Sequence, residues 1–124
     1  MNNRQSAFTL LEIMLVVAII GVLLAAAIYK MSPTLDVAKE TRARADIQGL
    51  RTLLLSYNGS NGYYPTGDQG LSALVPRLME SLPMDPWGKP YVYRYPGRSR
   101  PSSYDLFSSG PDGIPDTADD ITGQ

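Results

Sequence analysis

The chain has 124 residues, with 11 Lys and Arg, 12 Asp and Glu, 44% hydrophobic residues, and neither His nor Cys. This length suits one small domain. The lack of His and Cys excludes Ser–His–Asp and Cys–His catalysis, zinc fingers and disulfides, so any bound metal requires oxygen ligands. The net charge of −1 argues against a nucleic-acid partner, because phosphate binding favours a basic surplus.

The charge is distributed unevenly along the chain. Residues 1–100 carry 11 basic and 7 acidic side chains, whereas residues 101–124 contain five Asp and no Lys or Arg. The small net charge therefore combines a basic body with a compact acidic tail. Such a tail requires an explanation of its own.

A long apolar segment near the amino terminus predicts a membrane helix. Between Phe8 and Tyr29 the only charged side chain is Glu12, and at about 1.5 Å per residue the segment is long enough to cross a hydrocarbon layer of about 30 Å. The short stub before it contains Arg4. The positive-inside rule then places the amino terminus in the cytoplasm and the residues after Lys30 on the far side.

Three interpretations of this segment differ in how they treat Glu12. A secretory signal peptide would use the small residues 25–27 for cleavage, and a plain single-pass anchor would need no cleavage. Both leave unexplained a charge that costs roughly 2.5–3.5 kcal/mol in the membrane. The third interpretation gives the carboxylate a partner of opposite charge, because a buried charge is tolerated when it is paired.

Residues 7–12, with the sequence AFTLLE, resemble the processing site of type IV pilin-like proteins. In that superfamily a prepilin peptidase cuts after a small residue and methylates the new amino-terminal Phe. The resemblance implies cleavage between Ala7 and Phe8 and N-methylation of Phe8. It also implies that Glu12 of one subunit neutralises the amino group of Phe8 in its neighbour within a helical filament.

Helical periodicity continues beyond the membrane segment. Mostly apolar residues recur at three- and four-residue intervals, at Leu35, Ala38, Arg42, Ala45, Ile47, Leu50, Leu53, Leu54 and Tyr57. One helix from about Phe8 to Tyr57 fits this pattern, with a bend at Pro33. Alternatively, Pro33 begins a second helix that Ser32 caps. In either case the stripe is expected to form part of the core.

Turn-forming residues 58–62 are expected to stop the helix. Thr66 and Gln69 have the spacing of a capping box, which predicts a short second helix that buries Leu71, Leu74, Val75 and Leu78. Residues 91–95 alternate so that three tyrosines share one face, and residues 103–108 read as the returning strand. The predicted fold class is α+β, with a long amino-terminal helix packed on a small antiparallel sheet.

The order of motifs in the second half resembles the major pseudopilin of type II secretion systems. The distinguishing blocks are Asp-Pro-Trp-Gly at residues 85–88 and Ser-x-Gly-x-Asp-Gly at residues 108–113. Together with residues 7–12, the resemblance covers nearly the whole chain. It implies four parts, namely a cleaved leader (1–7), a transmembrane assembly helix (8–29), an amphipathic helix reaching into the periplasm (30–57), and a small α+β globular part with the strands and a calcium loop (58–124).

The acidic tail has two interpretations. It can be a solvated, turn-rich tail, or it can bind Ca²⁺, which takes six to eight oxygen ligands. An EF-hand is excluded, because starting at Asp112 puts Ile114 and Gly123 at positions that require acidic or amide ligands. The resemblance implies Ca²⁺ as the cofactor, held by the side chains of Asp112, Asp119 and Asp120 and the carbonyl of Ser109. It leaves Asp116 outside this ligand set or solvated.

The resemblance implies the major structural subunit of the type II secretion pseudopilus. Such a subunit sits in the bacterial inner membrane as a single-pass protein with a periplasmic carboxy-terminal domain. It polymerises to drive folded proteins across the outer membrane. The implied partners are further copies of the chain, minor pseudopilins, the inner-membrane assembly platform and prepilin peptidase. A type IV pilin of an adhesive or motility filament is the alternative. An enzyme is not expected, because no spacing pairs Lys39 or Lys89 with a Ser.

Overall fold

The computed structural model describes residues 7–123, except for the side chains of residues 31 and 32. Its elements are α1 (Leu10–Asn61), the 3₁₀ helix η1 (Gly70–Leu74), and the strands β1 (Val92–Arg94), β2 (Asp105–Ser108) and β3 (Ile121–Thr122). The chain divides into two compact units, Met1–Asp36 and Val37–Gln124. Of the expected leader, residues 1–6 lie outside the described part.

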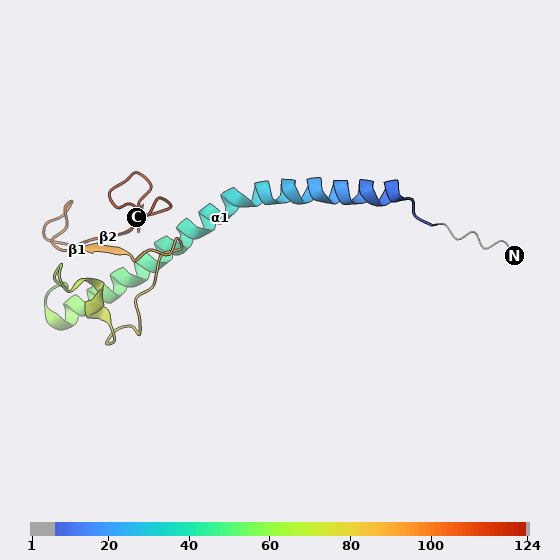
Figure 1. Ribbon diagram of the computed structural model, residues 1–124. Helices are drawn as coiled ribbons and strands as arrows, with labels where there is room; N and C mark the ends of the chain where they lie inside the picture. The colour runs from blue at the N-terminus through green and yellow to red at the C-terminus, as the bar shows by residue number, and fades with distance from the viewer. Residues whose placement is uncertain (1–6, 124) are drawn as a thin grey trace. The chain divides into compact units, whose positions relative to one another are not determined.

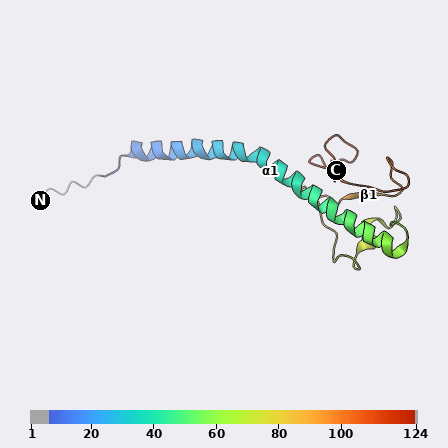
Figure 2. The ribbon, with the colours of Figure 1, turned by 180° about the vertical axis from the view of Figure 1, so that it is seen from behind.

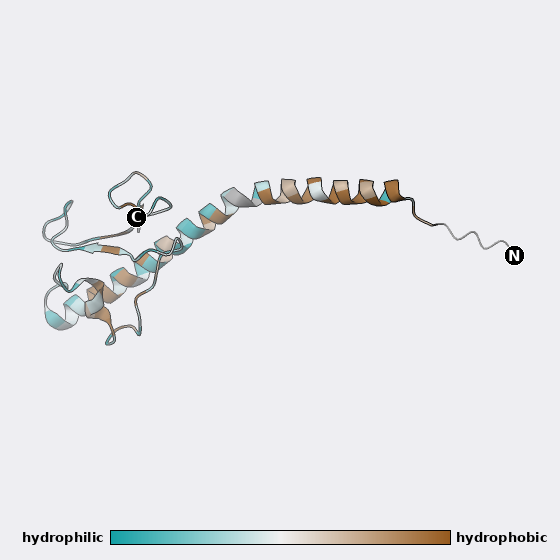
Figure 3. Cartoon of the chain, in the orientation of Figure 1, coloured by the Kyte–Doolittle hydropathy of each residue, from teal (hydrophilic) through white to brown (hydrophobic). Residues whose placement is uncertain are grey.

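The first part of α1 is apolar and exposed. Figure 3 shows that hydrophobic residues concentrate in the amino-terminal half of this helix, whereas hydrophilic residues become frequent further along it. By length and composition, α1 is able to cross a membrane. Pro33 lies inside α1, so the alternative in which this proline separates two helices is wrong.

The carboxy-terminal end of α1 lies four residues beyond the predicted end at Tyr57. The turn formers at 58–61 remain helical because the end is closed further along the chain. The N–H of Gly62 donates to the carbonyl of Asn58 at 2.7 Å, and the Asn61 amide donates to the carbonyl of Tyr57 at 2.9 Å. Gly62 has a φ of 82°, the left-handed conformation in which glycine commonly terminates a helix.

The core of the second unit forms where α1 meets the sheet. Figures 1 and 2 both show β1 alongside the carboxy-terminal half of α1. The cluster joins four residues of α1 to residues from η1, the strands and the segment before β1, namely Ala43, Ile47, Leu50, Leu54, Leu71, Leu74, Tyr91, Leu106 and Ile121. The predicted stripe is therefore confirmed at Ile47, Leu50 and Leu54. It is wrong at Leu35, which is 56% exposed, and at Ala38, Arg42 and Ala45, which are also exposed.

The three strands form an antiparallel sheet in the order β1-β2-β3. Tyr93 pairs with Leu106, and Val92 pairs with Phe107, which in turn pairs with Thr122. Since paired residues share a face, Leu106 points to the core while Phe107 lies on the opposite face. The two predicted strands are confirmed in shorter form, and β3 was not predicted.

The expected second helix is a single 3₁₀ segment. The capping box is present, because Thr66 N–H donates to Gln69 Oε1 at 3.3 Å and Gln69 N–H donates to Thr66 Oγ1 at 3.4 Å. Leu71 and Leu74 are buried, as predicted, but Val75 is extended and only half-buried. Regular helix therefore does not reach Leu78, the last of the residues expected in it.

Candidate functional site

The amino-terminal site is built around a reciprocal pair of hydrogen bonds at the start of α1. Thr9 N–H donates to Glu12 Oε2 at 2.9 Å, and Glu12 N–H donates to Thr9 Oγ1 at 3.2 Å. This is a capping box, with Thr9 as the cap and Glu12 as the third helical residue. The helix begins at Leu10 and not at Phe8, because Thr9 occupies the capping position.

The capping box gives Glu12 a partner within its own chain. The resemblance to pilin-like proteins implies only the amino group of a neighbour as its partner, whereas the Thr-x-x-Glu spacing at residues 9–12 is the sequence signal of the box. Ala7 and Phe8 lie just before the helix, and Phe8 is 82% exposed. The residue implied to become the new amino terminus is therefore accessible in the single chain.

The acidic tail folds into a closed loop between β2 and β3. Gly110 has a φ of 66°, and a Cβ atom placed there would lie 2.2 Å from the carbonyl oxygen of Asp119. Only glycine permits this approach of the two ends of the loop. Asp112 N–H donates to Asp119 Oδ2 at 3.0 Å, which links the ends a second time.

Two of the expected calcium ligands are joined through one hydroxyl group. Thr117 Oγ1 donates to Asp119 Oδ1 at 2.5 Å and lies 3.4 Å from Asp120 Oδ1. The hydrogen bond from Thr117, followed by that from the N–H of Asp112, lowers the pKa of Asp119 and favours its ionised form. The loop thus presents carboxylate oxygens, the donor type that Ca²⁺ prefers.

The other two expected ligands, Asp112 and Ser109, are not linked to the Thr117 hydroxyl. Asp112 Oδ1 accepts the N–H of Ile114 at 2.8 Å, so binding an ion requires it to exchange this hydrogen bond. Ser109 is buried at the base of the loop. Within residues 7–123, no three acidic side chains converge as a ready metal cluster. The donor chemistry therefore fits Ca²⁺, but the carboxylates need a local rearrangement and support from backbone carbonyls.

Asp116, which is expected outside the calcium ligand set, is bound by two arginines. Arg94 donates two hydrogen bonds of 2.7 and 2.8 Å to its carboxylate, and Arg98 donates a third at 3.2 Å. The Arg94 guanidinium holds the pKa of Asp116 below its usual range. Asp116 N–H also donates to Asp120 Oδ2 at 2.8 Å, so this residue positions one of the expected ligands.

The base of the loop is held by the buried carboxylate of Asp85, for which the sequence patterns predict no role. Asp85 is 3% exposed, and its Oδ1 accepts the N–H groups of Trp87 and Lys89 at 3.1 and 2.7 Å. Its Oδ2 accepts the hydroxyl of Ser108, whose oxygen accepts the N–H of Gly110. Asp85 therefore fixes the start of the acidic loop through Ser108.

Comparisons with known proteins find matches to both the amino-terminal segment and the rest of the chain. The family described as type II secretion system (T2SS), protein G, matches residues 30–123, and the prokaryotic N-terminal methylation motif matches residues 2–28. The type II secretion system core protein G of Dickeya chrysanthemi is 42% identical over 98% of this chain and 87% of its own length. Its counterpart from Escherichia coli K12 is 41% identical over 98% of this chain and 92% of its own length.

A solved structure shows the same fold. The major pseudopilin from the type 2 secretion system of enterohaemorrhagic Escherichia coli superposes with a TM-score of 0.64 and 37% sequence identity, over 72% of this chain and 85% of that chain. The family match to residues 30–123 and the two full-length relatives agree with this likeness. The chain belongs to the type II secretion system protein G family, the major pseudopilins.

Proposed function

We propose that this chain is the major structural subunit of a type II secretion pseudopilus, a filament that drives export of folded proteins across the outer membrane. The observation that carries the proposal is the exposed apolar half of α1, with Glu12 as its one acidic residue in the first turn. Such a surface is costly in water and is covered when helices associate. The match to protein G favours secretion over an adhesive or motility filament.

The proposed location is the bacterial inner membrane, with one span and the carboxy-terminal unit in the periplasm. The partners are further copies of the chain, minor pseudopilins, the inner-membrane assembly platform and prepilin peptidase. In this role the chain is a structural subunit and not an enzyme. A reporter active only in the periplasm, fused after Gly123, tests the topology. Activity of a cytoplasmic reporter at the same position contradicts it.

Processing is proposed between Ala7 and Phe8, with methylation of Phe8. The N-terminal methylation motif that matches residues 2–28 supports this step. Mass spectrometry of the mature chain tests it. A mature chain that begins with N-methylated Phe8 is expected. A chain that begins after residues 25–27 shows a signal peptide, and an intact chain shows an uncleaved anchor.

Assembly is proposed to transfer the Glu12 carboxylate from the N–H of Thr9 to the amino group of Phe8 in a neighbouring subunit. Each of these charges is costly alone in an apolar surrounding, and pairing offsets much of that cost. Two substitutions separate the charge from the helix cap. Glu12→Gln keeps an oxygen that can accept the Thr9 N–H, because Gln also serves in capping boxes. Glu12→Ala loses both functions.

Both variants are expected to be cleaved, to remain in the membrane and to form no filaments by electron microscopy. Normal filaments from Glu12→Gln, together with their loss in Glu12→Ala, would assign Glu12 to helix capping and contradict the charge pairing. Wild-type chain and Thr9→Ser, which retains a capping hydroxyl, serve as controls.

Calcium binding is proposed for the loop, with the side chains of Asp112, Asp119 and Asp120 and the carbonyl of Ser109 as ligands. Clustered carboxylates repel one another, and a bound divalent ion reverses this balance. Bound Ca²⁺ would fasten the loop in a chain that has no Cys for a disulfide. The oxygen donors of the loop support this proposal, and it requires Asp112 to release the N–H of Ile114.

Thermal melting of the full chain in detergent micelles tests the calcium proposal. A chelator is expected to lower the melting temperature, and calcium at 100 times its Kd should add about 2.7 kcal/mol of stability. Asp119→Ala and Asp120→Ala should abolish the response, whereas Asp68→Ala, on an exposed turn outside the loop, should retain it. A melting curve that calcium leaves unchanged in the wild type rules the proposal out.

A further inference from the structure

A cavity of about 640 Å³ lies on the face of the sheet that points away from the core. Its floor includes Phe107, which the strand register places on this face and which is nevertheless only 7% exposed. The guanidinium of Arg94 lies 5.3 Å from the centre of the Phe107 ring and covers it. The cavity therefore combines an apolar floor with charged walls, as many ligand sites do.

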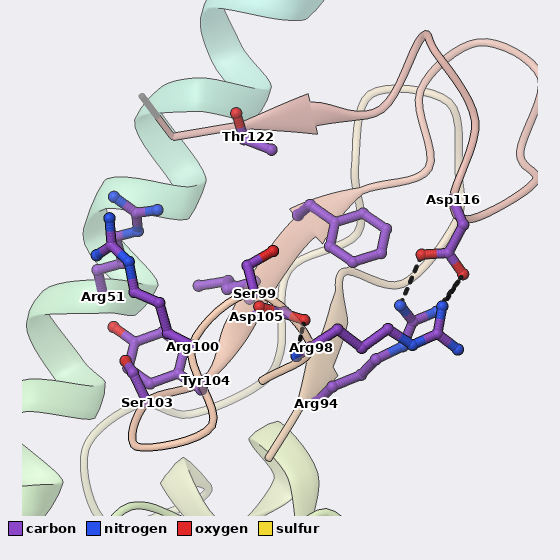
Figure 4. A pocket seen from close by; sticks show the side chains of 12 residues that line it. Arg51, Arg94, Arg98, Ser99, Arg100, Ser103, Tyr104, Asp105, Asp116 and Thr122 are labelled. Atoms are coloured by element: carbon purple, nitrogen blue, oxygen red, sulfur yellow. Dashed lines mark hydrogen bonds and ion pairs between the residues drawn. The ribbon is translucent and has the colours of Figure 1, made fainter. Parts of the chain in front are cut away.

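The charged walls carry an excess of positive charge. Four arginines and two aspartates contribute to the lining, namely Arg51, Arg94, Arg98, Arg100, Asp105 and Asp116. They come from α1, β1, β2 and the loops that follow β1 and β2. Figure 4 shows Arg94 and Arg98 pointing toward Asp116 on one side of the cavity, and Arg51 and Arg100 on the side of α1.

Only two of the four arginines form ion pairs with a lining carboxylate, and both use Asp116. Asp116 binds Arg94 and Arg98, as described above. The Oδ2 atom of Asp105 accepts the backbone N–H of Arg98 at 2.8 Å. Among the described residues, neither Arg51 nor Arg100 forms an ion pair with a carboxylate. Two guanidinium groups thus line one cavity with their charge uncompensated by side chains.

Hydroxyl groups add uncharged donors to the lining of the cavity. Ser99, Ser103 and Thr122 also line the cavity. The loop that carries Arg100 is closed by its own hydrogen bonds, since Gly97 N–H donates to the Ser103 carbonyl at 2.8 Å and Ser103 N–H donates to the Arg100 carbonyl at 2.9 Å. This closure holds the donors of the loop close to Arg51, which reduces the entropy lost on binding.

We infer that the cavity binds a phosphate dianion, either inorganic phosphate or a phosphomonoester. Guanidinium groups bind phosphate oxygens through paired hydrogen bonds. The charge of about −1.5 to −2 on a monoester at neutral pH matches the uncompensated arginines. Two guanidinium groups with three hydroxyls offer more donors than the two oxygens of a carboxylate can accept. The inference is independent of filament formation and of calcium binding.

Isothermal titration of the full chain in neutral detergent micelles with inorganic phosphate tests the inference. We expect saturable binding of one phosphate per chain that sodium chloride at matched ionic strength does not reproduce. Arg100→Met and Arg51→Met should each weaken binding by about 10-fold or more, through loss of charge-assisted hydrogen bonds. Arg77→Met removes an exposed arginine outside the cavity and should bind as the wild type does.

Two further arms distinguish the sources of the phosphate. Glycerol phosphate, a monoester, competes with inorganic phosphate if the cavity accepts an organic group, and fails to compete if the site takes the free ion. Vesicles that contain phosphatidylglycerol present a phosphodiester with one charge. The inference is overturned if phosphate does not bind, if Arg77→Met loses as much affinity as Arg100→Met, or if the vesicles bind while phosphate does not.

Discussion

The hydroxyl of Ser108 donates a hydrogen bond of 2.7 Å to the Oδ2 atom of Asp85, and both residues are almost completely buried. These residues belong to the two sequence blocks on which the resemblance to the major pseudopilins rests, Asp-Pro-Trp-Gly and Ser-x-Gly-x-Asp-Gly. The two blocks are therefore linked by a buried hydrogen bond. It connects the turn before β1 to the start of the acidic loop.

Asp85→Ala is expected to destabilise the carboxy-terminal unit by about 3–5 kcal/mol. The substitution leaves the Ser108 hydroxyl and the N–H groups of Trp87 and Lys89 without their acceptor in a buried site. Ser108→Ala removes two hydrogen bonds, the one to Asp85 and the one from the N–H of Gly110, and should cost about 2 kcal/mol. Urea denaturation followed by the fluorescence of Trp87, the single Trp, measures both. Equal costs for the two variants would contradict a central role for Asp85.

The pairing of Asp116 with Arg94 is expected to keep the acidic loop closed when no metal is present. Asp116→Asn retains a residue type that tolerates the φ of 67° but removes the charge. It should therefore increase hydrogen exchange in the loop in the presence of a chelator. Asp116→Gly suits the same φ and also removes the charge.

Exchange of the two charges provides the control for this pairing. Arg94→Asp and Asp116→Arg should each open the loop, while the double variant should restore part of the protection, because opposite charges again face each other. Unchanged exchange in Asp116→Asn and Asp116→Gly would show that the remaining hydrogen bonds close the loop by themselves.

The stability of the carboxy-terminal unit is expected to fall at alkaline pH. Burial raises the pKa of Tyr91, and so does its hydrogen bond of 2.7 Å to Asp46. Burial likewise raises the pKa of Tyr93 and Tyr104. The unfolded tyrosines ionise near pH 10 while the folded ones stay protonated. Stability is therefore complete below about pH 10 and is lost as the pH rises above it.

Urea denaturation at a series of pH values, followed by circular dichroism, measures this loss. The slope should approach about 1.4 kcal/mol per pH unit for each tyrosine that stays protonated in the folded chain. Tyr91→Phe should be less stable at neutral pH but should show a shallower alkaline slope. Identical slopes in wild type and Tyr91→Phe would show that Tyr91 ionises equally well in the folded state.

The capping box at the start of α1 is expected to order the first helical turn. Thr9→Ala should expose the N–H of Glu12 and weaken the helix start by about 0.5–2 kcal/mol, whereas Thr9→Ser should retain the cap. Amide hydrogen exchange of Glu12 in micelles, measured by NMR, distinguishes the two variants. Equal exchange in Thr9→Ala and Thr9→Ser would contradict a role for the Thr9 hydroxyl.

Local patterns in the sequence predicted most of the secondary structure. The three- and four-residue spacing located Ile47, Leu50 and Leu54 in the core, and the Thr66–Gln69 spacing predicted a real capping box. The helix end was placed too early because the residues at 58–61 are turn formers by type. Their actual conformation depends on Gly62, whose left-handed backbone closes the helix four residues beyond the predicted end.

Contacts between distant residues were not predictable in the same way. Asp85 and Ser108 are 23 residues apart, and Arg94 and Asp116 are 22 apart. No periodicity links such positions, since only the folding of the sheet brings them together. β3 has two residues, too few to show an alternating pattern. The cluster of acidic residues is evident from the sequence. The sequence does not show that Asp116 binds Arg94 while Asp119 and Asp120 form hydrogen bonds within the loop.

Pro33 lies within α1 and has no N–H, so it cannot donate the usual helical hydrogen bond to the carbonyl oxygen of Tyr29, four residues earlier. An unsatisfied carbonyl costs several kcal/mol in hydrocarbon but little where water reaches it. In the proposed membrane setting, this oxygen limits how deeply the helix inserts. Insertion that keeps the turn of Tyr29 and Lys30 at the water interface leaves the oxygen hydrated, whereas deeper insertion costs the free energy of burying it in hydrocarbon.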